Sequence, residues 1–442
     1  MKIQVKPEAE KKLRQGYPWI MDNEVFELPR GFQQGTCVDF VNRKDEFLAF
    51  GYFNSKSRIS GRVLTFDSTK KSITQNKKLS EHLVKCWQLR KERGFRGSFR
   101  LCFGESDFLP GLVIDYYLLD NHHQVFSIQM LTLGMQGLFA DYLDILKEVV
   151  IQANQLGLTS TSWEDTSIVL RNDVNVRKYE GLEVDVPRVV RTLREIDLSK
   201  CQILVNEVAG LGALALTVDL YQGQKTGFFL DQTENIRRVV QYMSQRSKSL
   251  DTLRVLDLCC YVGHWSAQIA RHLSILPVSA SASESVSTRE IRGVKCHLVD
   301  VSEKALAVAA KNVGVWTTEV ETSRLNVLEE LDTLPSQSYD LVIADPPAFV
   351  KSKKDLPTGK HAYAKLNAQA FRLVKPGGYV VSCSCSGLLE EDDFREALQK
   401  AQSRAQVRAQ MILRGSISAD HPALCSFPEA GYLKMVMNQV LD

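Results

Sequence analysis

Features that would place this chain in a membrane or mark it for secretion are absent from its sequence. No apolar run approaches the roughly 18 residues that a membrane-spanning helix requires. The first seven residues, Met-Lys-Ile-Gln-Val-Lys-Pro, contain no apolar signal core. We therefore expect a cytoplasmic protein that has no membrane partner.

Cysteine pairs and an excess of one charge are also absent. The ten cysteines have no framework spacing and form no CxxC pair, which favours reduced thiols over disulfides or a bound metal. Lys and Arg number 55 against 52 Asp and Glu, for a net charge of +3. So balanced a charge neither demands nor excludes a nucleic-acid partner, because a local basic face would suffice.

The composition that is present belongs to an ordinary globular protein of more than one domain. Hydrophobic residues make up 44% and charged residues 24% of the 442 positions. That length exceeds what one compact core usually holds, so we expect two or three domains.

The N-terminal part alternates apolar and polar residues and is rich in aromatics, which favours a small β-barrel. The expected strands are 37–42, 47–53 and 62–66. Leu83, Trp87 and Arg90 then recur at helical spacing, which predicts a connecting helix over residues 79–94.

The middle of the chain predicts a small α+β domain in the order strand, strand, helix, strand, strand. These elements are expected at 111–115, 125–129, 135–156, 167–171 and 174–178. A β-hairpin is expected around 202–219, with Gly210 and Gly212 at its turn.

From about residue 227 the pattern changes to alternating strands and helices, which indicates βαβ units and a mostly parallel sheet. Strands are expected at 254–258, 296–300, 339–344 and 379–383, with a helix at 303–312. The Ser/Ala-rich stretch 279–288 is interpreted as an exposed insertion. The chain is thus predicted to be multidomain α/β, with domains at 1–75, 76–200 and 201–442.

Two acidic residues end neighbouring strands of that sheet. In Val255-Leu-Asp-Leu-Cys-Cys-Tyr-Val-Gly263, a strand passes through Asp257 into a glycine-containing turn where a nucleotide-like ligand can bind. A full G-x-G-x-x-G pattern is missing, so the motif alone is weak evidence for a dinucleotide. Asp300 can accept both hydroxyls of a ribose or can cap the next helix, although Ser302 is better placed as the cap.

Two further strands end in chemically distinctive residues. The prolines of Asp345-Pro-Pro-Ala-Phe349 hold the Asp at the sheet edge, and Phe349 either stacks on an extruded base or is simply buried. In Ser382-Cys-Ser-Cys-Ser-Gly387, alternation leaves Cys385 nearest the carboxyl end. A reactive thiolate needs a cation, for which Lys351 and Lys353 are candidates, unless they are solvated loop charges.

These blocks together resemble bacterial 23S ribosomal RNA cytosine-5 methyltransferases that carry an N-terminal PUA domain. The resemblance covers nearly the whole chain, and the order of its blocks is more specific than any one of them. The blocks are Val5-Lys-Pro7, Tyr17-Pro-Trp19, Phe103-Gly-Glu-Ser-Asp-Phe-Leu-Pro-Gly-Leu-Val-Ile-Asp115, Arg171 to Gly181, Lys225-Thr-Gly-Phe-Phe-Leu-Asp-Gln232, Asp345 to Phe349, Ser384-Cys-Ser-Gly387 and Asp420-His-Pro422.

The resemblance implies a PUA-like barrel, a central α+β domain and a Rossmann-like class I methyltransferase domain that uses S-adenosylmethionine. It implies 23S rRNA as partner; a homodimer is a further possibility. It assigns Cys385 and Asp345 to catalysis. The implied donor-binding residues are Phe228, Gln232, Asp257, Cys259, Tyr261, Gly263, Asp300, Val301, Asn326, Val327 and Asp345, and the implied substrate-binding residues are Pro346, Phe349 and Lys351.

Four positions depart from the family pattern. Asn326 stands where an acidic residue often lies beside the adenine, although its amide can still bond to the ring edge. His264 and Trp265 replace the usual Gly-aromatic pair. Ala348 stands where many RNA cytosine-5 enzymes have a second cysteine, so Cys385 would carry the covalent step alone.

The mechanism that the family implies begins with addition of the Cys385 thiolate to carbon-6 of cytosine, while Asp345 bonds to the ring. Methylation of guanine or of an exocyclic amine, which needs no cysteine, is one alternative. A non-catalytic RNA-binding or ribosome assembly factor is another. The arginines considered as phosphate contacts are Arg58, Arg62, Arg93, Arg96, Arg171 and Arg177.

Overall fold

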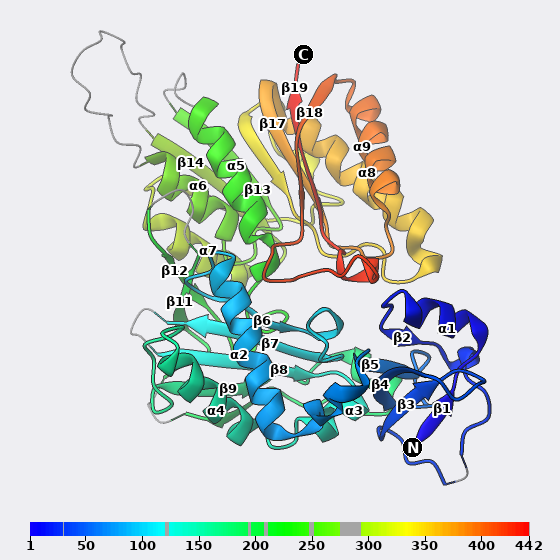
Figure 1. Cartoon of the computed structure of the whole chain (residues 1–442). Helices are drawn as coiled ribbons and strands as arrows, with labels where there is room; N and C mark the ends of the chain where they lie inside the picture. The colour runs from blue at the N-terminus through cyan, green and yellow to red at the C-terminus, as the bar shows by residue number, and fades with distance from the viewer. Residues whose placement is uncertain are drawn as a thin grey trace, which may run out of the picture. The chain divides into compact units, whose positions relative to one another are not determined.

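The computed structural model describes residues 1–29, 31–119, 123–192, 196–206, 211–246, 252–274 and 293–441. They belong to two compact units (Figure 1). The first unit comprises Met1–Asn206, Val218–Leu230 and Ala419–Ala430, and the second comprises Glu207–Thr217, Asp231–Ser418 and Gly431–Asp442. Gly210 and the stretch 279–288, both named in the sequence predictions, lie outside the described residues.

The N-terminal part of the first unit is a five-stranded sheet in the order β1-β3-β4-β5-β2. Its strands are β1 Lys2–Gln4, β2 Trp19–Ile20, β3 Cys37–Val41, β4 Phe47–Phe53 and β5 Gly61–Thr65, with helix α1 at Pro7–Arg14. Alternate residues such as Ile3, Phe40 and Phe53 bury their side chains in one core. The three predicted strands are confirmed, whereas β1, β2 and α1 are too short to give a periodic signal.

A second five-stranded sheet, in the order β10-β9-β8-β7-β6, completes the first unit. Its strands are β6 Phe99–Phe103, β7 Leu112–Leu118, β8 Gln124–Met130, β9 Thr166–Leu170 and β10 Arg188–Arg191, and its helices are α2 Asn76–Glu92, α3 Leu133–Leu138 and α4 Tyr142–Gln155. The connecting helix is confirmed as α2, and Trp87 from it is buried in this core. The helix expected over 135–156 is two helices, because the chain leaves helical geometry at Phe139.

The strand predicted at 174–178 is wrong. These residues lie in a 3-10 helix, Asn175–Glu180, which ends at Gly181 in the left-handed conformation with φ of 75°. The Arg177 guanidinium is buried and donates to the carbonyl oxygens of Met130 and Glu183, so a buried charge shapes this segment. The strand that pairs with β9 is β10, further along the chain.

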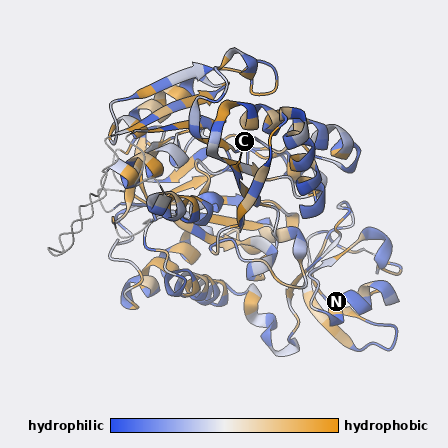
Figure 2. Ribbon diagram, turned by 90° about the horizontal axis from the view of Figure 1, so that it is seen from above, coloured by the Kyte–Doolittle hydropathy of each residue, from blue (hydrophilic) through white to orange (hydrophobic). Residues whose placement is uncertain are grey.

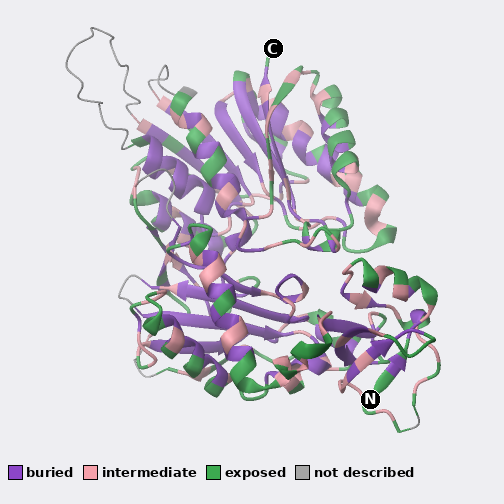
Figure 3. Cartoon of the chain, in the orientation of Figure 1, coloured by how far each residue is buried: buried purple, intermediate pink, exposed green. Residues whose placement is uncertain are grey.

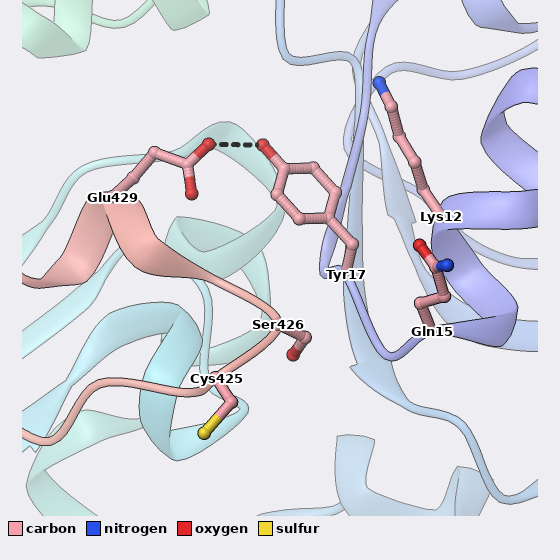
Figure 4. Close-up of a pocket in the computed structure, with 6 residues that line it drawn as sticks. All are labelled: Lys12, Gln15, Tyr17, Cys425, Ser426 and Glu429. Carbon is pink, nitrogen blue, oxygen red and sulfur yellow. Dashed lines mark hydrogen bonds between the residues drawn. The ribbon is translucent and has the colours of Figure 1, made fainter.

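The segment 419–430 returns to the first unit from late in the sequence. The backbone N–H of Arg100 donates to Asp420 Oδ2 at 2.8 Å, and the Tyr17 hydroxyl donates to Glu429 Oε1 at 2.8 Å (Figure 4). Burial is the main reason why the pKa of Tyr17 is raised. A cavity of about 650 Å³ opens here, lined by Lys12, Gln15, Tyr17, Cys425, Ser426 and Glu429.

The second unit is built on a seven-stranded sheet in the order β15-β14-β13-β16-β17-β19-β18. Its strands are β13 Thr252–Leu258, β14 Gly293–Asp300, β15 Val320–Arg324, β16 Tyr339–Ala344, β17 Val374–Ser384, β18 Ala409–Ser416 and β19 Lys434–Val440. The first five strands in that order are parallel, and β19 is antiparallel to both of its neighbours. The four strands predicted here are confirmed, and the sheet is mostly parallel as expected.

Helices cover both faces of this sheet. They are α5 Thr233–Arg246, α6 His264–Ser274, α7 Glu303–Gly314, α8 Leu356–Leu373 and α9 Glu391–Ala405. Helices α8 and α9 pack on each other, as do α5 and α6, and Figure 1 shows the two pairs on either side of the strands. The inner strands of the sheet are apolar and buried, whereas the outer helix surfaces are polar and exposed (Figures 2 and 3).

The strand order fixes where a ligand can bind. From β13 the chain moves outward to β14 and β15 and then returns to β16 on the other side of β13. In parallel α/β sheets, such a reversal opens a crevice at the carboxyl ends of the strands. Short strands β11 Cys201–Val205 and β12 Leu214–Val218 form where a hairpin was expected. Within the described ranges, no helix is both long and apolar enough to cross a bilayer.

Candidate active site

The turn between β13 and α6 has an unusual backbone. Cys259, Tyr261 and Gly263 all have positive φ, at 64°, 48° and 79°. Two of the three carry side chains, for which this conformation is uncommon and costs energy. Strain of this kind is concentrated at ligand-binding turns, and this turn lies at the crevice that the strand order creates.

Gly263 is needed for helix packing. A Cβ atom here would lie 3.1 Å from Val313 Cγ2 and 3.2 Å from Ala309 Cβ, both on α7. The left-handed backbone at this position disfavours a side chain as well. The sequence indicated a glycine that lets a ligand approach the backbone, but the structure shows α7 on the side where a Cβ would point.

Asp257 lies beneath the same turn. Its side chain is fully buried and accepts a hydrogen bond from Ser266 Oγ at 2.7 Å, which joins β13 to α6. Its other oxygen, Oδ1, is buried without a partner among the described residues. Burial, with smaller contributions from Asp345 and Asp300, raises the pKa of Asp257 to about 7. Its role toward a donor stays a prediction.

Asp300 connects two turns at the carboxyl edge of the sheet. Its Oδ2 accepts from the backbone N–H of Tyr261 at 3.0 Å, and its Oδ1 accepts from that of Ser302 at 2.9 Å. Ser302 is the cap of α7, with its Oγ accepting from Ala305 N at 3.2 Å, as the sequence predicted. Each carboxylate oxygen has a second lone pair, so the partly exposed Asp300 can still accept the hydroxyls of a ribose.

Three predicted donor contacts follow β14 and β15. Val301 is 62% exposed, and Val327 is buried. Asn326 Oδ1 accepts from the backbone N–H of Leu328 at 3.1 Å, so the amide nitrogen of Asn326 faces away from this bond. Asn326 therefore offers a donor, which suits a ring nitrogen and does not suit an exocyclic amine.

Asp345 is held by three neutral donor bonds. Gln232 Nε2 lies 3.0 Å from both carboxylate oxygens, and Trp265 Nε1 donates to Oδ2 at 3.0 Å. Asn235 Nδ2 in turn donates to Gln232 Oε1 at 2.8 Å, which orients the amide. Residues from α5, α6 and the residues before α5 thus fix this carboxylate at the end of β16.

Gln232 was predicted as a donor contact; the structure shows it bonded to Asp345, and its role toward the donor stays a prediction. Trp265 was noted in the sequence only as a departure from a family pattern, and Asn235 was not singled out. Their indole and amide groups come together only through the fold, so periodicity gave no signal for them. Phe228 belongs to the first unit, and its role toward the donor stays a prediction.

The Cys385 loop contacts the loop that follows Asp345. Cys385 is half-buried, and its Sγ lies 3.8 Å from the carbonyl oxygen of Pro346. Ser386 Oγ accepts from Val350 N at 3.1 Å and lies 2.9 Å from the Tyr363 hydroxyl. Because the two loops are joined twice, the thiol is held beside the Asp-Pro-Pro turn.

The other cysteine of this strand is placed differently. Cys383 is completely buried, and burial raises the pKa of its thiol well above the usual value. This difference in depth agrees with the sequence prediction that Cys385 lies nearest the carboxyl end of the strand.

Lys434 is a cation bonded to the Cys385 loop that the sequence did not reveal. It pairs with Ser384 across β17 and β19, and its Nζ donates to the carbonyl oxygens of Ser386 at 3.0 Å and Tyr432 at 3.1 Å. Burial lowers the pKa of Lys434, and the charges of Glu390 and then Cys385 oppose that shift. The predicted cations Lys351 and Lys353 are exposed on the loop after Phe349.

Two aromatic residues singled out in the sequence are placed as follows, and their roles toward a ligand stay predictions. The Phe349 ring is half-buried and lies 4.8 Å from the Tyr363 ring, so it packs on protein at this edge. His264 is buried at the start of α6, and burial lowers its pKa to about 3. A neutral His264 follows, which cannot act as a cationic group at neutral pH.

Three of the six arginines considered as phosphate contacts are buried and bonded to protein groups. Arg62 is buried and pairs with Glu105 at 2.6 Å and Glu180 at 3.1 Å. Arg171 is buried and pairs with Asp173 at 3.0 Å, and Arg177 is the buried residue described above. Exposed arginines among those predicted are Arg58, Arg93 and Arg96.

The fold and this edge define a class I, S-adenosylmethionine-dependent methyltransferase. The open sheet reverses direction beside β13, a strained turn and Asp300 can receive a nucleoside, and Asp345 and Cys385 lie beyond them. Among the described residues, no cluster of three His, Cys, Asp or Glu side chains could hold a metal ion.

Comparisons with known proteins agree with this class and give the family. Residues 3–66 match a PUA-like domain model, and residues 249–422 match a methyltransferase domain model. Ribosomal RNA large subunit methyltransferase I of Klebsiella pneumoniae is 30% identical over 433 residues, covering 96% of this chain and 94% of the relative. The protein of the same name from Shewanella frigidimarina is 29% identical over 451 residues, covering 100% and 99%. The chain belongs to the ribosomal RNA large subunit methyltransferase I family.

Solved structures support the fold. A Streptococcus mutans protein assigned as a SAM-dependent methyltransferase matches with a TM-score of 0.68 at 17% identity, over 100% of both chains. A methyltransferase solved in complex with SAH matches with a TM-score of 0.69, also at 17% identity and over 100% of both chains. At this identity the likeness establishes the fold alone.

Proposed function

We propose that this protein transfers a methyl group to carbon-5 of a cytosine in 23S ribosomal RNA, with Cys385 as the attacking thiolate. The observation that carries the proposal is the 3.8 Å approach of Cys385 Sγ to the Pro346 carbonyl oxygen. This contact supports the proposal because Pro346 directly follows Asp345 at the same sheet edge. The large-subunit RNA substrate is taken from the family's name.

S-adenosylmethionine, when bound, supplies an electrophilic methyl group. The residues present fit it, because Asp300 keeps acceptor capacity for a ribose and Asn326 offers an amide donor to a purine ring nitrogen. The strained backbone from Cys259 to Gly263 would form the wall beside it.

The protein's part in the reaction begins with the thiolate. Cys385 Sγ forms a bond to carbon-6 of the cytosine, and the ring electrons move so that carbon-5 becomes a nucleophile toward the methyl carbon. Asp345 accepts a hydrogen bond from the exocyclic amine, or from N3–H once the ring takes up charge. After transfer, a base removes the carbon-5 proton, and the electrons of that C–H bond expel the thiolate from carbon-6.

Neighbouring residues orient the Asp345 carboxylate and stabilise the Cys385 thiolate. Gln232 and Trp265 fix the Asp345 carboxylate in one orientation, which lowers the cost of aligning it with a base. The positive charge of Lys434 near Cys385 stabilises the thiolate form. Cys383 is too deeply buried to release the product in place of the second cysteine that Ala348 replaces.

A covalent trap tests the proposal. RNA that carries 5-fluorocytosine cannot lose a proton from carbon-5, so it should remain bonded to the wild-type protein and to Cys383→Ala. Cys385→Ala should form no adduct and transfer no methyl group. Full transfer by Cys385→Ala, or transfer to an exocyclic amine found by mapping the modified base, would contradict the proposed chemistry.

A further inference from the structure

One cavity of the first unit contains no residue of the catalytic edge, and its walls come from more than the PUA-like sheet. It encloses about 890 Å³ between the end of β5, the 3-10 segment Ser68–Thr74, helix α2 and the turn Gly104–Asp107. This volume lies in the range of about 300–1,000 Å³ that is typical of ligand sites. We call it the Phe66–Phe108 pocket, after the two aromatic rings in its wall.

The turn in this wall belongs to the family block Phe103–Asp115, and two of its three polar side chains have structural partners. Asp107 receives the buried guanidinium of Arg90 at 2.8 and 2.5 Å. Glu105 accepts from the indole of Trp19 at 2.8 Å and pairs with Arg62. These contacts explain the two acidic residues of the turn, and they leave Ser106 and the following Phe108 unexplained.

Ser106 and Phe108 both line the pocket. Ser106 has an energetically unfavourable environment in the free protein, and Phe108 has an unfavourable backbone conformation. Ser106 is only 7% exposed, and its hydroxyl is buried without a partner among the described residues. An unbonded buried hydroxyl is unfavourable when no ligand satisfies it. Phe108 has φ of 55°, a conformation that bulky residues rarely adopt. A ligand that bonds to Ser106 and packs on Phe108 would account for both.

The pocket also offers an acceptor and aromatic surface. His82 Nε2 lies 2.6 Å from the carbonyl oxygen of Asp107, which can only accept, so Nε2 carries the proton. Burial lowers the pKa of His82, so Nδ1 of the neutral ring is an acceptor. The rings of Phe66 and Phe108 meet edge to face at 6.4 Å. A pocket with these aromatic and polar walls suits a flat ligand that has polar edges.

Positive side chains surround this apolar pocket. Lys70, Lys78 and Lys85 all line it and are exposed. Lys70 and Lys78 form exposed pairs with Asp67 and Glu81, which contribute little and can be exchanged for phosphate. Lys85 forms no ion pair among the described residues, so its charge is open to a phosphate.

We propose that the Phe66–Phe108 pocket binds one unpaired nucleobase of the RNA substrate, with Lys85 on a flanking phosphate. Ser106 and His82 bond to the edge of the base, and the base stacks on a phenylalanine ring, as bases do in single-strand binding sites. This inference rests on the proposed function, since it needs an RNA substrate. It adds a second nucleotide-binding site, separate from the reacting cytosine.

Ser106→Ala gives a test in which thermal stability should rise while RNA affinity should fall. Removal of an unbonded hydroxyl should raise the melting temperature of the free protein. Affinity for a mixed-sequence single-stranded RNA, measured by fluorescence anisotropy with the full chain, should nevertheless fall about 2- to 10-fold. Unchanged affinity would mean that Ser106 contacts no base.

Two further variants test stacking and charge. Phe66→Leu keeps an apolar side chain and should weaken binding roughly 5- to 150-fold. Lys85→Glu should weaken binding and reduce the salt dependence of affinity by at least about one phosphate. Lys147→Glu, the same charge change on exposed α4 of the same unit, is the matched control and should have a much smaller effect.

Cross-linking locates the base and distinguishes the two proposals. RNA containing 4-thiouridine should cross-link to peptides that include Phe66 or Phe108. Cross-links only elsewhere, together with normal binding by Phe66→Leu, would refute the pocket even if the wild-type protein methylates 23S rRNA. If the wild-type protein methylates no cytosine but the cross-links and affinity losses occur, the proposed chemistry fails while the pocket stands.

Discussion

Replacement of the buried Asp257 by Asn should change how stability depends on pH. Folding raises the pKa of Asp257 from 3.8 to about 7, mainly because its carboxylate is desolvated. The folded state therefore holds a proton that the unfolded chain has released. For an acid whose pKa is raised, this contribution is fully present below the unfolded pKa and is lost as pH rises through the folded pKa.

The size of the effect follows from the shift. At 1.36 kcal/mol per pKa unit, the complete change is about 4 kcal/mol, of which about 3 kcal/mol develops between pH 5 and pH 8. Asn has nearly the same shape and keeps an oxygen to accept from Ser266 Oγ, but it has no proton to lose. The other titrating groups are common to both proteins, so they cancel in the difference between them.

Urea unfolding of both proteins across this pH range is the measurement. The free energy of unfolding of Asp257→Asn, minus that of the wild type, should increase by about 3 kcal/mol from pH 5 to pH 8. Ser266→Ala serves as a control, because it removes the hydrogen bond and leaves the titrating group. A difference that does not vary with pH would refute the reasoning that Asp257 is protonated when buried.

Three other changes concern the catalytic edge. Trp265→Phe removes one donor to Asp345 and should lower kcat/KM about 10- to 100-fold, while binding of S-adenosylhomocysteine measured by calorimetry stays close to normal. Lys434→Gln should raise the pKa of the Cys385 thiol, seen as a shift to higher pH in the rate of iodoacetamide alkylation, and Lys434→Arg should restore much of the original profile. Asn326→Asp replaces an amide donor by an acceptor for an exocyclic amine and should tighten binding of S-adenosylhomocysteine, so weaker binding would contradict the adenine placement.

The sequence predicted most of the second unit because its strands carry a strong signal. Parallel strands buried on both faces appear as short apolar runs, and those ending near Asp257, Asp300, Asp345 and Cys385 were all found. Strand ends also fixed which residues meet at one edge. Edge strands such as β15 and β18 are half-exposed and polar, so they gave no comparable run.

The remaining parts of the site depend on long-range contacts. Lys434 reaches the Cys385 loop only because β19 runs antiparallel to β17, a pairing that its own sequence does not encode. Trp265 and Gln232 meet at Asp345 across 80 and 113 residues of sequence. The strand predicted at 174–178 failed for a similar reason, since buried contacts of Arg177 override the local preference.

The late return of residues 419–430 to the first unit affects how the protein can be made. Arg90, in the N-terminal quarter of the chain, donates to the carbonyl oxygen of Asp420, and the backbone of Arg100 donates to its carboxylate. During synthesis, the N-terminal unit must wait for these partners until almost the whole chain has left the ribosome. A growing chain would hold incompletely satisfied buried groups for most of that time, and it would be exposed to aggregation and proteolysis. A prematurely terminated chain should therefore be degraded rather than persist as an RNA-binding fragment without methyltransferase activity.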